Sequence, residues 1–356
     1  MNRRVIRRVG AGAVLAIAAG MFFPSLSLTQ SSLRYEAVVD WPKPLPGRWV
    51  LGGLGGICVD AKDHVLILNR QDVIEGDLNG GTLAPPMIEF DPEGNVVHSW
   101  GDPALIDPRL HSCHFDKEGH VWIASAPSGM VQKYTHDGSK LLLQIGTKGK
   151  LDSSDGTAKG QPLNSPAATF FMPSSIFVDR TNGDVYVSDG EGAGTNRRVA
   201  VIDSTGKFLR HWVIDDMENV HCMTIANDGM VYVCNRQGSE IRVYDKTGKL
   251  QRAIPVPWRP VTPPPDGVVK QSGGSAVAID FSPDQTQRLM FVINQNNSQI
   301  EVIERATGKR LGSFGRPGSF PGQFNQVHGI AVDSKGHVYL DENRGRRVHK
   351  FRAVTR

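Results

Sequence analysis

The sequence has almost no net charge once its first residues are set aside. Its formal charge is +4, and four arginines without acidic neighbours supply four positive charges near the N-terminus: Arg3, Arg4, Arg7 and Arg8. The rest of the chain is therefore close to neutral and offers no basic surface for phosphate backbones. This absence argues against nucleic acid as a partner.

A long apolar run is also missing. The run from Val9 to Phe23 is short for a membrane-spanning helix. Arginines precede it, and Pro24 and small polar residues follow, which is the layout of an export signal. No clean small-x-small cleavage site is present, so an uncleaved anchor stays open, as does an interfacial or buried helix. We assign residues 1–32 to an export signal or N-terminal anchor and expect an exported protein, periplasmic or extracellular.

Cysteine is scarce, with four residues in a chain of 356. Export would permit disulfides. Cys222 and Cys234 could face each other on neighbouring strands, but the spacing of the cysteines fixes no pairing. We therefore predict four buried thiols, at Cys58, Cys113, Cys222 and Cys234.

Glycine and proline, in contrast, are abundant, with 39 and 22 residues spread along the chain. This spread indicates many turns between short strands rather than one disordered segment. From residue 50 onward one unit recurs: an apolar alternating run, a polar turn, and further apolar runs. Its clearest copies are "GGICVDAKDHVLILNR", "HSCHFDKEGHVWIAS", "SSIFVDRTNGDVYVSDG", "HCMTIANDGMVYVCNR", "SAVAIDFSPDQTQRLMFVINQ" and "HGIAVDSKGHVYLDENR".

The repeat predicts an all-β, six-bladed β-propeller over residues 33–356. A period of about 40–55 residues with four short strands per unit is typical of propeller blades, and six copies mean six blades. The sixth copy ends without a fourth strand, and an extra strand at Arg34 to Pro42 precedes the first copy. We infer that this strand completes the sixth blade and closes the ring, which removes exposed sheet edges. We expect a monomer, with a solenoid as the alternative fold.

Histidine occurs at one repeat position in alternate copies. The first strand of each blade lies nearest the axis, and its opening residue in copies one to six is Gly55, His111, Ser174, His221, Ser275 and His328. The three histidines are separated by 110 and 107 residues, which is two blades in each case. Equivalent positions on alternate blades of a six-fold ring form a triangle about the axis.

Three imidazoles pointing inward from such a triangle could share one metal ion. Three histidines with an open fourth position form the ligand set of a catalytic zinc site, and iron, copper or cobalt would also accept three nitrogens. Three polar side chains lining a watery channel are the alternative. We predict that His111, His221 and His328 bind zinc. Three other histidines fall in turns at the far end of the hairpins, where we expect them to be solvated: His64, His120 and His337.

An Asn-Arg pair recurs where the second strand ends, near the predicted triangle. It gives Arg70 in copy one and Arg236 in copy four, and copy six offers Arg344. Guanidinium groups beside a metal suit an anionic substrate, because arginine binds a carboxylate through two hydrogen bonds. A surface arginine paired with a neighbouring acid is the alternative. We favour the functional interpretation for Arg70 and Arg236.

The repeats resemble NHL repeats, and residues 50 to 352 resemble the peptidyl-α-hydroxyglycine α-amidating lyase family, a six-bladed zinc propeller. The motifs that carry the resemblance are "LHSCHFD", "VHCMTIA", "VHGIAVD", "LNRQD", "CNRQG" and "PSSIFVDRTNGDVYVSDG". That family cleaves a C-terminal α-hydroxyglycine into a peptide amide and glyoxylate. The resemblance implies zinc ligands and active-site arginines at five positions: His111, His221, His328, Arg70 and Arg236.

Two positions depart from the family pattern. The family has a catalytic tyrosine directly after the "SDG" of blade three, where this chain has Glu191 followed by a short insertion, "GAGT". The family also has an aspartate of a structural calcium site after the third histidine, where this chain has Gly329. The resemblance therefore implies zinc as the cofactor, with calcium as a second metal whose aspartate is missing. The family's disulfides do not match these cysteines.

By this resemblance we expect a zinc-dependent carbon–nitrogen lyase acting on a small molecule or a peptide C-terminus. The arginines would hold the substrate carboxylate, and Glu191 is the candidate base, since a carboxylate near zinc can accept a proton. A non-catalytic NHL propeller serving as an exported binding platform is the second hypothesis. A calcium-dependent lactonase ranks third, because that chemistry needs Glu, Asn and Asp around the axis where this chain has histidines.

Overall fold

The structure is a computed structural model that describes Met1 and residues 34–107, 109–259 and 275–354. Apart from Met1, the predicted export signal or anchor, residues 1–32, lies outside the described residues. Within the described ranges, no helix has the length and apolar character needed to cross a membrane.

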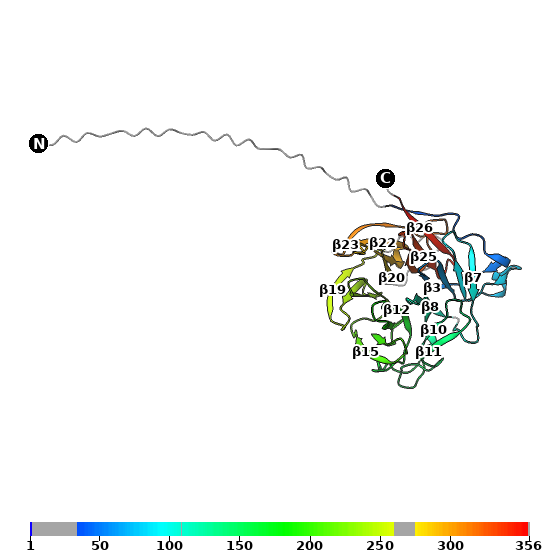
Figure 1. Cartoon of the computed structure of the whole chain (residues 1–356), viewed down its shortest axis with the longest axis horizontal. Helices are drawn as coiled ribbons and strands as arrows, with labels where there is room; N and C mark the ends of the chain where they lie inside the picture. Colours follow the sequence, from blue (N-terminus) through cyan, green and yellow to red (C-terminus); the bar gives the residue numbers. More distant parts are fainter. Residues whose placement is uncertain (2–33, 108, 260–274, 355–356) are drawn as a thin grey trace. The chain divides into compact units, whose positions relative to one another are not determined.

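The described residues form six four-stranded antiparallel sheets arranged as blades around one axis, which confirms the predicted six-bladed propeller (Figure 1). From the axis outward, the first three blades are β3 (Leu54–Val59), β4 (Val65–Asn69), β6 (Met87–Phe90) and β7 (Val96–Trp100); β8 (Leu110–Phe115), β9 (Val121–Ser125), β10 (Met130–Tyr134) and β11 (Leu141–Ile145); and β12 (Pro173–Val178), β13 (Val185–Asp189), β14 (Arg198–Ile202) and β15 (Phe208–Val213).

The other three blades follow the same order. They are β16 (Val220–Ile225), β17 (Val231–Asn235), β18 (Glu240–Tyr244) and β19 (Leu250–Pro255); β20 (Ala276–Phe281), β21 (Leu289–Asn294), β22 (Gln299–Glu304) and β23 (Lys309–Phe314); and β24 (Val327–Val332), β25 (Val338–Glu342), β26 (Val348–Val354) and β1 (Arg34–Ala37). Short elements add the parallel pair β2 (Trp49–Val50) and β5 (Thr82–Leu83), the helix α1 (Glu75–Leu78), and 3₁₀ turns at Pro46–Arg48, Ala126–Ser128 and Gln295–Asn297.

The ring closes by pairing the first strand of the propeller with the last. β1 lies antiparallel to β26, in a register that sets Arg34 opposite Val354 and Ala37 opposite Phe351. β1 thereby becomes the outermost strand of blade six, as the sequence predicted. The innermost strands contact their neighbours all the way round, from β3 through β8, β12, β16 and β20 to β24 and back. Closure therefore ties residues near both ends of the chain into one sheet.

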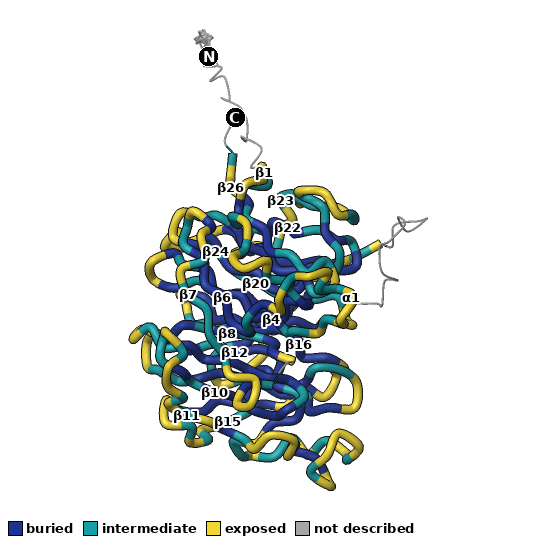
Figure 2. The backbone as a smooth tube through the Cα atoms, turned by 90° about the vertical axis from the view of Figure 1, so that its right-hand side faces the viewer, coloured by how far each residue is buried: buried dark blue, intermediate teal, exposed yellow. Residues whose placement is uncertain are grey.

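Burial follows the position of a strand within its blade. All residues of the second strands β4, β9, β13, β17, β21 and β25 are buried, because both faces pack against neighbouring blades. Outer strands such as β11 and β15 alternate between more and less exposed residues. Figure 2 shows the same gradient, with buried inner strands and exposed peripheral turns. The core is thus a set of apolar layers between blades.

The cysteines form two disulfides, so the prediction of four thiols is wrong. Cys58 of β3 is bonded to Cys113 of β8, which joins blades one and two, and Cys222 of β16 is bonded to Cys234 of β17 within blade four. All four residues are buried, as predicted. The first pairing spans 55 residues and depends on how neighbouring inner strands pack, which spacing along the chain does not reveal.

We predict that the protein denatured without reductant shows no thiol reactive toward Ellman's reagent, and four after reduction. Replacing Cys58 and Cys113 together by alanine should lower the free energy of unfolding by about 4 kcal/mol, because the bond closes a long loop of the unfolded chain. The Cys222–Cys234 bond closes a shorter loop. Replacing these two cysteines by alanine should therefore lower the free energy of unfolding, measured by urea denaturation, by about 3 kcal/mol. Four reactive thiols before reduction would contradict both bonds.

Candidate metal centre on the propeller axis

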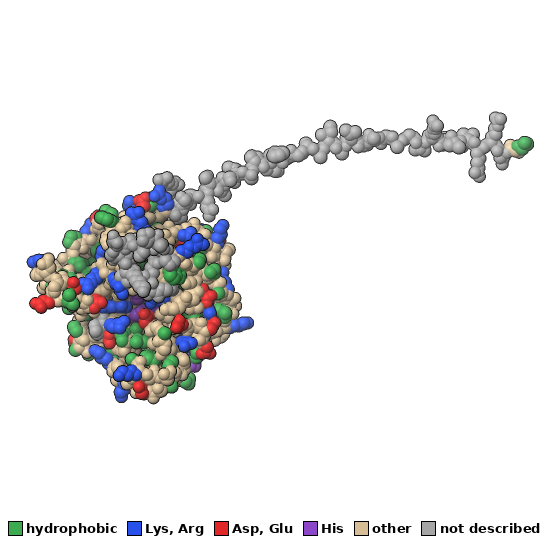
Figure 3. Space-filling model, turned by 180° about the vertical axis from the view of Figure 1, so that it is seen from behind, with side chains coloured by type: hydrophobic (Ala, Val, Ile, Leu, Met, Phe, Trp, Pro, Cys, Tyr) green, Lys and Arg blue, Asp and Glu red, His purple; other side chains and the backbone are tan. Residues whose placement is uncertain are grey.

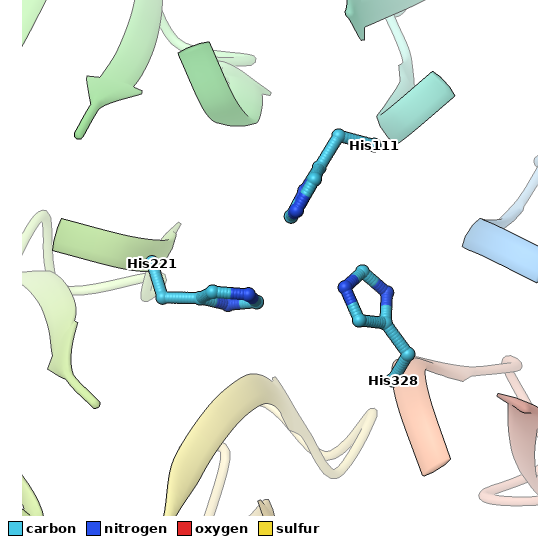
Figure 4. Close-up of side chains that lie close together, drawn as sticks. All are labelled: His111, His221 and His328. Carbon is cyan, nitrogen blue, oxygen red and sulfur yellow. The ribbon is translucent and has the colours of Figure 1, made fainter. Parts of the chain in front are cut away.

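Three histidines from alternate blades meet on the axis of the propeller. His111 lies on β8, His221 on β16 and His328 on β24, and their ring centroids are 4.8, 5.1 and 5.4 Å apart. Figure 4 shows the three rings pointing toward a common centre. One nitrogen from each ring lies within 4.8 Å of the others, close enough for a shared ion. The predicted triangle is therefore present in the fold.

Backbone carbonyls set the orientation of two of these rings. The Nδ1–H of His111 donates to the Ser174 carbonyl at 2.6 Å, and the Nδ1–H of His221 donates to the Val277 carbonyl at 2.8 Å. Each bond fixes the neutral tautomer in which the Nε2 lone pair is free, and metal-bound histidines commonly make this contact. The buried Nε2 of His221 has no hydrogen-bond partner. Such an orphaned lone pair fits a metal ligand.

The two carbonyls occupy equivalent positions in the repeat, and this corrects one sequence alignment. Ala276 pairs with Asn294 as Val220 pairs with Asn235, so Val277 in blade five is equivalent to His221. The prediction that Ser275 opens the fifth inner strand is wrong by two residues, because apolar residues and a bulge obscure the strand start in this copy. Each of the two oriented histidines thus donates to the equivalent residue of the next blade.

Burial keeps the imidazoles of His221 and His328 uncharged at neutral pH. It lowers the pKa of His221 to about 3, helped by the nearby Arg236 and opposed by Glu191. Burial likewise holds the pKa of His328 well below its usual range, with His111 and Arg70 adding to the effect. Only a neutral imidazole offers a lone pair to a metal ion. The rings of His221 and His328 are therefore ready ligands at physiological pH.

Glu191 follows β13 and reaches the triangle from blade three. Its Oε2 lies 3.1 Å from His221 Nε2, without hydrogen-bond alignment, and 3.4 Å from His111 Nε2. Burial acts to raise the pKa of this carboxyl, but the positive charge of the Arg236 guanidinium and of any protonated His221 or His111 ring outweighs it, so the pKa lies well below its usual range. The arrangement offers an ionised carboxylate as a base or as a fourth ligand.

The two arginines predicted at the site also lie beside the triangle. Arg70 follows β4, and its Nε donates to the Leu110 carbonyl at 2.9 Å. A side chain at Gly55 would place its Cβ 2.6 Å from this Nε, so the glycine makes room for Arg70. Arg236 follows β17 and approaches Glu191 Oε1 to 3.9 Å through Nη1. Two guanidinium groups therefore flank the histidine triangle, an arrangement suited to binding an anion.

The third arginine of the predicted column is not at the site. Glu342 ends β25 at the position where Asn69 and Asn235 end their strands, so the equivalent of Arg70 in blade six is Asn343. Arg344, one residue later, is exposed. The "NR" letters in this copy are therefore shifted by one residue relative to the register of the sheet.

Sequence reasoning missed Gln295, which has the same repeat position in blade five. Its Oε1 accepts a hydrogen bond of 2.7 Å from Arg236 Nη2, and its Nε2 donates to the Val327 carbonyl, next to His328. The signal was available, since "INQ" in copy five matches "LNR" and "CNR". Gln295 thereby links one flanking arginine to the strand that carries the third histidine.

The triangle lies at one end of a cavity of ≈ 570 Å³ along the axis, lined by all six inner strands. The histidines stand at the start of these strands, and Asp60 and Asp333 stand at their end. Figure 3 shows histidine side chains at the centre of one face, beside acidic and basic side chains. The site thus combines candidate metal ligands, charged side chains and a cavity.

Comparisons with known proteins agree with this architecture. No protein-family model matches the chain. NHL repeat-containing protein 3 of Homo sapiens is 26% identical over 92% of this chain and 86% of its own length. The probable peptidyl-alpha-hydroxyglycine alpha-amidating lyase of Caenorhabditis elegans is 18% identical over 85% and 83%, respectively. Peptidylglycine alpha-amidating monooxygenase of Rattus norvegicus is 24% identical over 50% of this chain and 18% of that protein.

The chain is an NHL propeller that resembles the amidating lyases. Among solved structures, a streptogramin B lyase shares 14% identity with a TM-score of 0.54, covering 90% of this chain and 98% of that one, which shows the fold alone. The shared propeller explains how the NHL repeats bring residues from alternate blades to one axis.

Gly329, one of the two positions that depart from the lyase pattern, lies beside the carboxylate of Asp341. A Cβ at Gly329 would lie 2.5 Å from Asp341 Oδ2, so the carboxylate of the neighbouring strand fills the space of a side chain at 329. Asp341 Oδ1 accepts a 2.8 Å hydrogen bond from the Gly329 N–H, whereas its buried Oδ2 has no partner. A carboxylate is therefore present beside His328 although the sequence position is glycine.

A buried ionic network holds the strand end that carries Glu191. Asp189 accepts hydrogen bonds from Arg198 Nε at 3.0 Å and Asn196 Nδ2 at 2.8 Å. The fully buried Arg198 also donates to the carbonyls of Ser165 and Thr169. The network thus fixes the backbone two residues before the proposed base.

We predict that Asp189→Ala lowers the free energy of unfolding by about 3–5 kcal/mol, because it strips the Arg198 guanidinium of its nearest buried counter-charge. Urea denaturation followed by circular dichroism measures the change. Asp215→Ala, at an exposed aspartate of the same blade, is the matched control and should change it by less than about 0.5 kcal/mol. Equal losses in the two variants would exclude this role of the network.

Proposed function

We propose that the chain is a zinc-dependent lyase that cleaves the carbon–nitrogen bond of a peptidyl-α-hydroxyglycine-type or other small carboxylated substrate. The observation that carries the proposal is the triangle of imidazoles, two of them oriented by backbone carbonyls, with a carboxylate and two guanidinium groups around it. The distant relative named as a probable amidating lyase supports the same reaction class.

The donor set fits zinc. His111, His221 and His328 would hold the ion, since three imidazoles and one exchangeable position are the ligands of catalytic zinc sites. When bound, zinc supplies Lewis acidity that makes a substrate hydroxyl easier to deprotonate. Calcium is not part of the proposal: Asp341 offers one free carboxylate oxygen, whereas Ca²⁺ takes about six to eight oxygen ligands.

The protein's own residues bind the substrate and move its proton. Arg70 and Arg236 hold the terminal carboxylate and so place the hydroxyl-bearing carbon beside the triangle. The Oε2 of Glu191 accepts the hydroxyl proton as the carbon–nitrogen bond breaks, and the proton passes to the departing amide nitrogen. The products are a peptide amide and an α-oxo acid. The expected substrate is therefore a small molecule or a peptide C-terminus, taken up by an exported monomer.

A second function, a binding platform without catalysis, is supported by two observations. The human relative that matches 92% of the chain is named only for its repeats. In addition, Glu191 Oε2 lies where a fourth ligand would complete a closed, structural metal site. In this case the metal would stiffen the axis, and the arginines would hold an acidic partner.

We predict that His221→Ala abolishes both zinc binding at the axis and glyoxylate release from a peptidyl-α-hydroxyglycine. Glu191→Gln should retain axial zinc, because three imidazoles remain, and should lower kcat by about 10²–10⁴-fold through loss of the base. Metal analysis and a glyoxylate assay test both variants. Full activity of a metal-free protein would refute the dependence of the lyase on zinc, and zinc without turnover in the wild type would favour the platform.

We predict that Arg70→Ala lowers kcat/KM for the carboxylated substrate by about 10- to 100-fold, because hydrogen bonds to a charged group contribute about 1.5–3 kcal/mol. The substrate analogue with an amide in place of the carboxylate should lose this dependence. Arg344→Ala, at an exposed arginine outside the site, is the matched control and should leave kcat/KM unchanged. Equal kinetics of the Arg70 and Arg344 variants would remove Arg70 from substrate binding.

A further inference from the structure

A second group of histidines and carboxylates lies at the other end of the β3–β4 hairpin. Glu89 Oε1 is 2.8 Å from His64 Nδ1 and 3.0 Å from His136 Nε2, and Asp60 Oδ2 is 3.9 Å from the same His136 nitrogen. The six residues of β3 span about 20 Å, so this outer cluster is separate from the axial triangle. Its residues come from blades one and two.

In some other blades a lysine stands at one of these two positions. In blade two the turn carboxylate of Asp116 pairs with Lys133 at 2.9 Å, and in blade three Asp179 pairs with Lys246 from the next blade. By the strand register, Glu89 replaces Lys133, because Glu89 lies opposite Leu66 as Lys133 lies opposite Trp122.

His136 replaces the second lysine. Tyr134 ends β10 as Tyr244 ends β18, so His136, two residues later, is equivalent to Lys246. Around Asp60, a second carboxylate, Glu89, stands where blade two has Lys133. An imidazole, His136, stands where blade four has Lys246. Among the described residues, neither Asp60 nor Glu89 forms an ion pair with a lysine or arginine.

From this arrangement we infer that the outer cluster is a second zinc site, with His64, Glu89, His136 and Asp60 as ligands. Zinc–nitrogen and zinc–oxygen bonds of about 2.0–2.2 Å place the ligand atoms of a tetrahedral site about 3.4 Å apart. The three observed distances of 2.8, 3.0 and 3.9 Å lie around this value. One ligand atom each of Asp60, His64 and Glu89 lies within 4.8 Å of the others, and His136 reaches this group through Glu89 and Asp60.

The surroundings orient the ligands and leave a path for the ion. Asp60 Oδ1 accepts two backbone hydrogen bonds of 2.8 Å, from Lys62 and His64, which leaves Oδ2 for the metal. The His136 ring stacks on Phe115, with centroids 5.2 Å apart. The Glu89 side chain is 4% exposed, whereas those of His64 and His136 are 26% and 38% exposed. Solvent thus reaches the imidazoles while the carboxylate stays desolvated.

Four protein ligands from two blades indicate a structural rather than a catalytic role. The ion would neutralise two carboxylates that the repeat elsewhere pairs with lysine. It would also fasten blade one to blade two at the end of the strands far from the axial triangle. His64, expected from the sequence to be a solvated turn residue, is instead half-buried and bonded to Glu89.

The test counts zinc in the purified full-length chain, after chelation and reloading with Zn²⁺ alone, by mass spectrometry of the metal. The wild type should hold two equivalents. Glu89→Gln and His64→Ala should each lose one, and His221→Ala should lose the other. His120→Ala, the equivalent turn histidine of blade two, is the matched control and should keep both.

A further variant separates metal binding from folding. Glu89→Lys restores the residue type of blade two, so the protein should fold and keep its Tm while losing one equivalent of zinc. The outer site is refuted if Glu89→Gln and the wild type hold equal zinc; the cluster is then an imidazolium–carboxylate ion pair. If instead the axial triangle binds no zinc, the result is different. The His221→Ala variant would then still hold one equivalent of zinc, and the Glu89→Gln variant would hold none.

Discussion

The hydrogen bonds between β1 and β26 are the interaction on which the rest of the structure depends. They join residues 34–37 to residues 351–354 and turn a row of six sheets into a ring. In a closed ring the innermost strands have one radius and one spacing. Histidines more than a hundred residues apart along the chain then meet with centroids about 5 Å apart. In an open array of the same repeats, these side chains would have no common centre.

Two contacts of the repeat recur around the ring, one at each end of the innermost strand. At the start of the inner strand, a histidine donates to the carbonyl of the equivalent residue in the next blade, which frees its Nε2 for the axis. At the end of that strand, a carboxylate in the turn attracts a cation from its own blade or the next. Small changes at these two positions convert structural contacts into the proposed ligand sets. The axial triangle and the outer cluster both arise in this way.

Electrostatics distinguishes the axis from the rest of the core. Burial suppresses the charge of the His221 and His328 imidazoles, while the guanidinium of Arg236 favours an ionised Glu191 against the effect of its burial. The Asp189–Arg198 pair, buried two residues away, holds this strand end in place. Glu191, one of the two residues that depart from the lyase pattern, is therefore also the anionic group of the site with the most contacts to hold it in place. The missing aspartate at Gly329 is similarly replaced in space by Asp341.

The sequence alone determined the number of blades, the closing strand and the histidine column, because each depends on a periodic pattern along the chain. It also placed Arg70, Arg236 and Glu191, whose motifs end strands. Only the tertiary structure decided the disulfides, the register that replaces Ser275 by Val277 and Arg344 by Asn343, and the partnership of Asp341 with Gly329. These features depend on contacts between neighbouring strands and blades, where one bulge or one residue of slip changes the partner. The sequence shows which residues occupy equivalent positions of the repeat. Which of these residues are in contact depends on the geometry of the closed ring.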